Sequence, residues 1–179
     1  MEVRTAQQEV RTVFVNGSAG QAVSGLIWLI STALSTWAGI YTGMLALVLG
    51  GVFIFPLTQL ALKLMGRRAA LSRENPFNAL AMQVAFIVPL MIPVIWAAAR
   101  GNAAWFYPAF MIVVGAHYLP FMTLYGMWQY AILAAVLIGG GVAILFLLPG
   151  SFTIGGWLGS AALIVFAVFA WQMRSKDRG

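Results

Sequence analysis

His117 is the only imidazole of this chain, and the sequence contains no cysteine. An imidazole can relay protons or bind a metal ion near neutral pH, but both tasks need other polar groups close by. The acids lie near the chain ends or in one loop: Glu2, Glu9, Glu74 and Asp177. This inventory excludes thiolate metal sites, iron–sulfur clusters and c-type haem, and it offers His117 no acid for a Ser-His-Asp triad. We therefore expect no metal site, no cofactor and no enzymatic activity.

His117 stands beside Tyr118 and three residues before Pro120, inside a long apolar stretch. Proline has no amide hydrogen, so Pro120 should kink this helix and free the carbonyl of Ala116 beside the imidazole. A titratable group inside a membrane predicts a functional site by default. Two interpretations stay open. His117 and Tyr118 line a substrate cavity or relay protons, or a neutral His117 donates a hydrogen bond to a neighbouring helix.

A second candidate is a stripe of small and polar residues in the first apolar stretch. Its members recur at steps of three and four residues, which keeps them on one helix face: Gly17, Gln21, Ser24, Trp28, Ser31 and Ser35. Such a stripe is typical of close helix packing, where small residues let backbones approach and hydroxyls bond across. The alternative is that Gln21, Ser24 and Trp28 line a ligand cavity.

Two glutamines and three prolines complete the set of candidates. Gln59 and Gln83 are further polar residues in apolar stretches, and we include both as candidate cavity-lining residues. Pro56, Pro89 and Pro93 should each release one backbone carbonyl and kink the helix that contains it. Interrupted helices of this kind bind ligands in transporters, and elsewhere they are simple kinks that neighbouring helices satisfy.

These residues must be positioned by membrane-spanning helices. Of the 179 residues, 62% are hydrophobic and 8% are charged, whereas soluble domains carry roughly 25% charged residues. The composition excludes a soluble enzyme and predicts an all-α polytopic membrane protein. Stretches of about 20 apolar residues indicate six spans in a compact bundle, at roughly 19–38, 41–64, 77–99, 106–126, 129–148 and 154–173.

The charges orient these spans. Nine of the ten basic residues precede span one, join spans two and three, or follow span six, and only Arg100 falls on the other side. This positive-inside pattern predicts that both termini lie in the cytoplasm. All fourteen charges are expected outside the spans, which leaves the bilayer interior without fixed charge. Aromatic residues near span ends, including Tyr107 and Tyr130, are expected at the membrane interface. The basic residues form no continuous face, so we expect no nucleic-acid partner.

The chain divides into three parts. Residues 1–16 combine polar side chains with an apolar stripe at helical spacing, formed by Val3, Ala6, Val10, Val13 and Phe14. We interpret them as an amphipathic helix lying on the membrane surface, with a cleaved signal peptide as the alternative. Residues 17–173 are the six-helix domain, and 174–179 are a basic cytoplasmic tail.

The whole chain resembles small six-span bacterial inner-membrane proteins of unknown function. The resemblance depends on Gly17–Gly20, on Ser24-Gly25 with Trp28, and on the run from Gly115 to Tyr118. It implies a location in the bacterial inner membrane, but no activity.

Two main hypotheses for function therefore stay open. One is a transporter or ligand-binding membrane protein for a neutral or apolar small molecule. The other is a non-catalytic subunit of a larger membrane complex. In that case we expect the chain to form a homo-oligomer or to bind a partner membrane subunit. An intramembrane enzyme would have to depend on His117 with Tyr118, or on Arg100.

Overall fold

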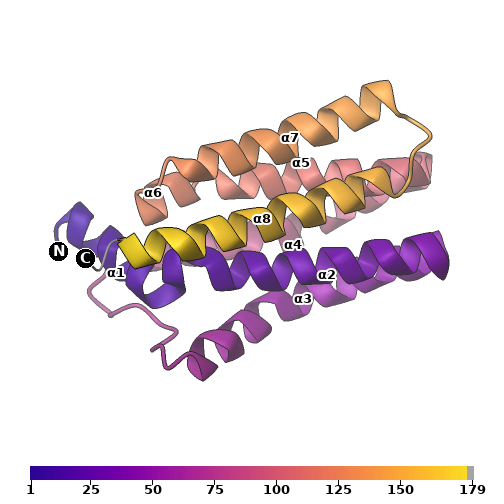
Figure 1. Ribbon diagram of the computed structural model, residues 1–179. Coiled ribbons are helices and arrows are strands. Elements are labelled where there is room, and N and C mark those ends of the chain that lie inside the picture. Colours follow the sequence, from indigo (N-terminus) through magenta and orange to yellow (C-terminus); the bar gives the residue numbers. More distant parts are fainter. Residues whose placement is uncertain (177–179) are drawn as a thin grey trace.

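Within residues 1–176, which a computed structural model describes, the chain is helical almost throughout (Figure 1). The helical segments are α1 (Val3–Phe14), η1 (Val15–Gly17), α2 (Ser18–Trp37), α3 (Ile40–Leu64), α4 (Asn78–Gly101), η2 (Ala103–Trp105), α5 (Phe106–Tyr118), α6 (Phe121–Tyr125), α7 (Gln129–Leu147) and α8 (Ile154–Lys176). Six helical stretches in this part of the chain are long and apolar enough to cross a membrane. The predicted all-α, six-span architecture is confirmed, and the protein is a multi-pass membrane protein.

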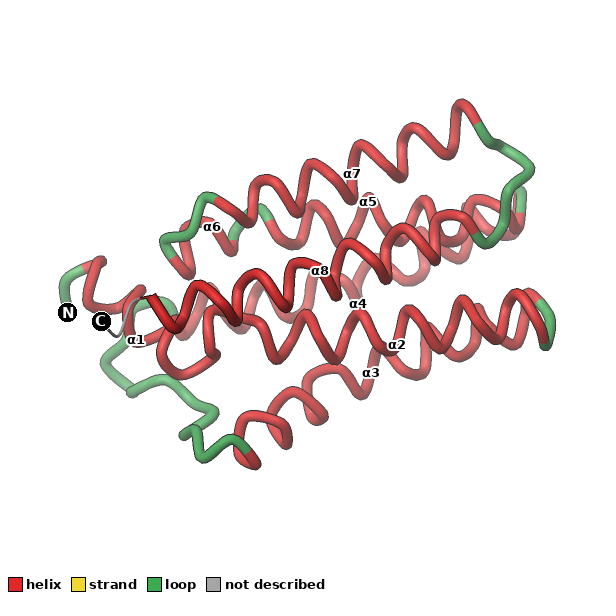
Figure 2. The backbone as a smooth tube through the Cα atoms, viewed as in Figure 1, coloured by secondary structure: helices red, strands yellow, loops and turns green. Residues whose placement is uncertain are grey.

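The long helices run side by side, and their connections gather at two ends (Figure 2). At one end lie α1, α6 and the loop between α3 and α4 (Figure 1). We call this the α1 end, and the opposite end the far end. Helix α2 packs along both α3 and α8, while α5 packs along α7. Helix α4 packs mainly on α5, so α3 and α4 are the outer helices. In the most apolar 18-residue segment of each of these two helices, only 11% of the residues are buried.

Local signals explain where several helices begin and end. Asn75 Oδ1 accepts a hydrogen bond from the amide of Phe77 over 2.9 Å, just before α4 begins. Gly39 between α2 and α3 has φ 117°, and Gly126 after α6 has φ 62°, a backbone region that favours glycine. These residues therefore mark turns that the chain can make without Cβ strain.

Glycines also let helices approach closely. A Cβ added to Gly159 of α8 would lie 2.5 Å from the Trp28 ring of α2, and one on Gly156 would collide with the side chain of Thr32. A Cβ on Gly155 would lie 3.0 Å from Tyr107 Cβ. The small-residue face of α8 is therefore used inside the bundle, against α2 and α5.

The structure shows what the apolar stripe of α1 packs against. Most of the stripe is covered by protein, because Ala6 and Val10 are fully buried and Val13 is 8% exposed, whereas Val3 is 59% exposed. Val10 belongs to the same core cluster as Tyr125 and Met127, so α1 packs its apolar face on the protein. Burial against protein satisfies the same amphipathic pattern as burial in a membrane surface.

Two further expectations were wrong in detail. The fourth span is not one kinked helix but two, because α5 ends at Tyr118 and α6 begins at Phe121, with Pro120 as its N-cap. The spans are also not free of charge, since Lys63 lies in the last turn of α3 and Arg100 in the last turn of α4. Long cationic side chains can reach the interface from a helix terminus, where the helix dipole also favours them. Of the predicted tail, residues 174–176 continue α8, and Arg178 lies outside the described residues.

Candidate functional site: a tyrosine cluster beneath α1

Polar side chains from three spans meet inside the bundle at the α1 end. We call Gln21, Ser24, Tyr118 and Tyr130 the tyrosine cluster. Gln21 Nε2 donates to the Tyr130 hydroxyl over 3.2 Å, and the Tyr118 hydroxyl lies within hydrogen-bonding reach of Ser24 and Gln21. Gln21 is 2% exposed and Tyr130 is fully buried. The cluster therefore joins α2 to α7 through a neutral, buried hydrogen bond, and α5 places the Tyr118 hydroxyl beside it.

A left-handed turn between α1 and α2 fixes one side of this cluster. Val15, Asn16 and Gly17 have φ values of 55°, 54° and 80°. This turn aims the Asn16 carbonyl at the bundle, where it accepts from the Tyr130 hydroxyl over 2.9 Å. A Cβ on Gly17 would collide with that hydroxyl. The turn at Asn16 and Gly17 thus positions a backbone acceptor for the cluster.

His117 lies next to the tyrosine cluster but bonds elsewhere. Its ring centroid is 5.3 Å from that of Tyr118 and 5.1 Å from that of Phe121, and it interacts with the backbone of Val84 in α4. The Ala116 carbonyl, expected to be free, accepts from the Leu119 amide over 3.2 Å. The chain has tightened into a shorter turn here, which satisfies the acceptor that Pro120 would otherwise leave open.

Four buried polar atoms in residues 1–176 have no hydrogen-bond partner. They are Gln21 Oε1, Thr58 Oγ1, His117 Nδ1 and Gln129 Oε1. Buried polar groups are usually paired, so each such atom needs an explanation. Gln21 and His117 belong to the predicted site. Their unpaired atoms lie toward the α1 end, where α2 begins and α5 ends.

Trp28 is separated from Gln21 by two turns of α2 and has a different environment. It is 1% exposed, and its ring centroid lies 6.1 Å from that of Tyr107 and 5.7 Å from that of Phe110. Gly159 of α8 closes on the same ring. Trp28 therefore fills the middle of the bundle between α2, α5 and α8.

A second polar group lies toward the far end. The Tyr107 hydroxyl is 2.6 Å from Ser31 Oγ and 2.8 Å from Ser35 Oγ, and Ser31 Oγ also donates to the Gly43 carbonyl over 2.8 Å. These contacts tie α2 to α3 and α5. The polar stripe of α2 thus faces the bundle over its whole length, and each of its parts bonds to different helices.

The structure does not bring the two remaining glutamines to the tyrosine cluster. Gln59 is half-buried on α3, and Gln83 is exposed on α4. The backbone stays helical through Pro56 in α3 and through Pro89 and Pro93 in α4, whereas the helix is interrupted at Pro120. Of the predicted residues, Gln21, Ser24, His117 and Tyr118 come together. Trp28, Gln59 and Gln83 do not join them.

Sequence reasoning missed Tyr107, Tyr125 and Tyr130 as interior residues. Tyr107 and Tyr130, expected at the interface, are fully buried, and Tyr125 is 5% exposed. Tyr130 stacks near Tyr118 and Tyr125, with ring centroids at 6.0 Å and 5.2 Å. Position near a span end gives the depth of a tyrosine but not the side of the helix it occupies. One signal could have indicated Tyr107: Ser31 and Ser35 share the inward face of α2, and their hydroxyls need hydrogen-bond partners from another helix.

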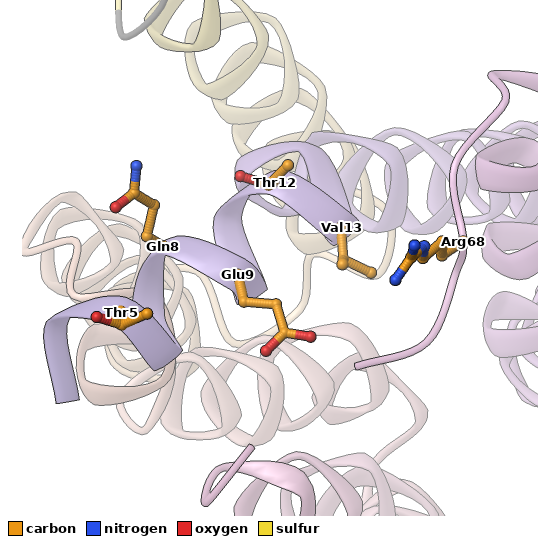
Figure 3. Close-up of a pocket in the computed structure, with 6 residues that line it drawn as sticks. All are labelled: Thr5, Gln8, Glu9, Thr12, Val13 and Arg68. Carbon is orange, nitrogen blue, oxygen red and sulfur yellow. The ribbon is translucent and has the colours of Figure 1, made fainter. Parts of the chain in front are cut away.

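A groove runs along α1, outside the bundle interior (Figure 3). It measures about 400 Å³, and its lining consists of Thr5, Gln8, Glu9, Thr12 and Val13 from α1 and Arg68 from the loop between α3 and α4. Figure 3 shows Arg68 pointing toward α1 across this groove.

The Glu9 carboxylate fastens α1 to the same loop. Its Oε1 accepts from the Ser72 amide over 2.6 Å, and its Oε2 accepts from Ser72 Oγ over 3.0 Å and from Asn75 Nδ2 over 2.8 Å. The backbone hydrogen bond from Ser72 is the main cause that holds the pKa of Glu9 below its usual value, and Asn75 and the charge of Arg68 act in the same direction. On the other side of α1, Gln7 Nε2 donates to the Thr123 carbonyl over 2.8 Å. Helix α1 is therefore fixed on both sides.

The chemistry available to the tyrosine cluster is hydrogen bonding by neutral groups. No cluster of three or more His, Cys, Asp or Glu residues that could hold a metal ion is found within residues 1–176. The family model of DUF7010, a family of unknown function, matches residues 3–173, and the chain belongs to that family. No curated protein and no solved structure matches the chain. The resemblance to proteins of unknown function is thereby confirmed.

Proposed function

We propose that this protein is a non-catalytic subunit of a membrane assembly, and that α3 and α4 pack against helices of another polypeptide chain. One observation carries the proposal. The two outer helices have prolines on their uncovered faces, and each proline leaves a backbone carbonyl without its helical donor. Lipid tails cannot donate hydrogen bonds to such groups, whereas a neighbouring helix can.

The positions of the prolines define these faces. Pro56 of α3 is exposed, and so is Val52, whose carbonyl would normally accept from residue 56. In α4, Pro89 and Pro93 are exposed, and they remove the helical donors of Ala85 and Pro89. Three carbonyls on uncovered helix faces therefore lose the amide donor that lies four residues later in their own helix. In other proline-containing spans, neighbouring helices, hydroxyl side chains or local changes in helix geometry restore these bonds.

A polar side chain supports the same interpretation. Gln83 is exposed on α4, less than two turns from the start of that helix. An amide that faces hydrocarbon is unfavourable, and in membrane bundles such side chains hydrogen-bond across helix interfaces. Gln83 supplies both a donor and an acceptor, which a partner helix can use.

Site-specific photo-crosslinking in native membranes tests the proposal. A crosslinking residue at Val52 or Leu90 should give one product of defined mass, which is either a dimer of this chain or an adduct with one stoichiometric partner. Val165 of α8 is a matched control, because it is 67% exposed, similar to Val52 at 66% and Leu90 at 72%. A crosslinker there should give no such product. Equal labelling at all three positions, or lipid adducts alone, would overturn the proposal.

A specific observation also favours a second candidate, a binding protein or transporter for a neutral small molecule. Gln21 Oε1 and His117 Nδ1 are buried without partners, and a ligand could supply the missing hydrogen-bond donors. Ligand-induced stabilisation should then depend on both residues. A panel of neutral compounds that raises the unfolding temperature of wild type and of the Gln21→Leu and His117→Ala variants equally would exclude this candidate.

We further propose a bacterial inner-membrane location with both termini in the cytoplasm, supported by the basic residues at the α1 end. The chain has no cysteine, so single cysteines report topology cleanly. An impermeant thiol reagent should label intact cells at Arg100→Cys and not at Glu2→Cys. The opposite pattern would invert the orientation.

A further inference from the structure

We propose that the groove between α1 and the loop from α3 to α4 binds the phosphate headgroup of an anionic membrane lipid. The groove goes beyond the proposed subunit function, because it lies at the α1 end rather than on the outer faces of α3 and α4. Its position suits a headgroup. Arg68 follows the last residue of α3, Leu64, by four positions, so the groove opens where a membrane-spanning helix leaves the hydrocarbon.

The lining supplies the chemistry that a phosphate needs. Arg68 contributes a guanidinium with several donors, and Thr5, Gln8 and Thr12 contribute neutral donors from one side of α1. These α1 residues recur at steps of three and four, which places them along one helix face. Guanidinium groups bind phosphate through charge-assisted and often bidentate hydrogen bonds.

Glu9 is the one acid in the lining, and both of its oxygens already accept hydrogen bonds. Three donors from Ser72 and Asn75 bind its two oxygens, and these donors approach from the loop. These bonds hold the carboxylate against the wall of the groove, but it keeps its negative charge. The attraction for an anion therefore depends on Arg68 and on the other basic residues around the groove.

The surroundings of the groove are basic overall. Residues 1–16 and the segment 63–75 together contain six basic residues, Arg4, Arg11, Lys63, Arg67, Arg68 and Arg73, against three acids. Basic residues at a membrane surface attract anionic lipids, with each Lys or Arg worth about 1 kcal/mol. Because the groove adjoins the end of a span and has a positive environment, an anionic headgroup fits it better than a zwitterionic one.

The test compares lipids that share acyl chains and differ in headgroup. The purified full chain in detergent is titrated with short-chain phosphatidylglycerol, with the matching phosphatidylcholine, or with inorganic phosphate, while its unfolding temperature is measured. Wild type should be stabilised by phosphatidylglycerol and much less by the other two. The Arg68→Gln variant should need about fivefold more phosphatidylglycerol for the same shift, which corresponds to the loss of one basic contact.

Matched variants keep the outcome clear. Arg100→Gln removes the same charge from an exposed residue in the last turn of α4, outside the groove, and should leave the titration unchanged. Thr12→Val keeps the volume of an exposed groove residue and should weaken binding less than Arg68→Gln does. An unchanged titration in Arg68→Gln, or equal stabilisation by both lipids, would overturn the proposal. A response to inorganic phosphate as strong as that to phosphatidylglycerol would show a site for free phosphate and reject the lipid.

Discussion

Gly43 lies where α2 and α3 approach each other closely, and its replacement by alanine tests how these helices pack. A Cβ at this position would collide with the backbone carbonyl of Ser31 and with Ser35 Oγ, and it would lie 2.7 Å from Ser35 Cβ. A backbone carbonyl inside a helix cannot rotate away, so α2 and α3 would have to separate. Overpacking of this kind costs about 1–3 kcal/mol. The shift would also strain the bond from Ser31 Oγ to the Gly43 carbonyl.

Gly51 is a control within the same helix. A Cβ there would have no neighbour within 4 Å, so Gly51→Ala should stabilise the protein by about 0.5–1 kcal/mol through helix propensity alone. Gly43→Ala gains the same helix propensity, so the two variants should differ by the overpacking cost of about 1–3 kcal/mol. Unfolding of detergent-solubilised protein by dodecyl sulfate, followed by circular dichroism, measures this difference.

The reasoning about Gly43 fails if Gly43→Ala needs as much dodecyl sulfate for unfolding as Gly51→Ala, or more. A Ser35→Ala change added to Gly43→Ala refines the test. It removes the hydroxyl but not the Ser31 carbonyl, and should recover only part of the loss. Full recovery would show that a movable side chain, and not the backbone, limits the approach of the two helices.

Two further predictions concern the hydroxyl group at the far end and the attachment of α1. Tyr107→Phe removes a buried hydroxyl that contacts two serines, and it should lower the free energy of unfolding by about 0.6–1.7 kcal/mol in the same assay. Tyr41→Phe is the control, because that side chain is 72% exposed, and its stability should not change measurably. Equal losses of stability in both variants would contradict the role of the Tyr107 hydroxyl. The pKa of Glu9 is lowered in the folded protein, so its contribution to α1 docking is complete above the unfolded value near 4.5 and is lost as pH falls through the lower folded pKa. A spin label attached at Glu2→Cys should therefore become mobile in acid. Glu9→Gln should make the label mobile at neutral pH, whereas the control Glu74→Gln should not. A label that stays immobile in acid would refute the proposed role of Glu9 in holding α1.

The spans could be predicted from sequence because their signal is one-dimensional. A run of about 20 apolar residues is sufficient to identify a spanning helix, whatever packs against it. The position of α1 could not be predicted in this way. Val10 is fully buried, but its apolar stripe would look the same if it faced lipid. The break at Pro120 was visible in the sequence, but the capture of the Ala116 carbonyl by Leu119 depends on how far the local backbone tightens.

The candidate site was predicted in part for a similar reason. Periodicity placed Gln21 and Ser24 on one inward face of α2, and both are buried as expected from that face. Which residues meet them depends on the rotation of α5 and α7, and apolar spans leave that rotation undetermined. Tyr130 therefore became the main partner of Gln21 without a local signal in its own helix.

The distribution of polar groups connects the two proposals. Inside the bundle, hydroxyl and amide groups of the α2 stripe form hydrogen bonds to α3, α5 and α7. Isolated atoms such as Gln21 Oε1 stay unpaired. Most of the groups that the proposals use lie outside this interior. They are the proline-freed carbonyls and Gln83 on the uncovered faces of α3 and α4, and Arg68 beside the groove of α1. Since recognition needs groups that are not already satisfied, this distribution supports the proposed contacts with membrane partners at the periphery more than the alternative of a substrate site at the centre.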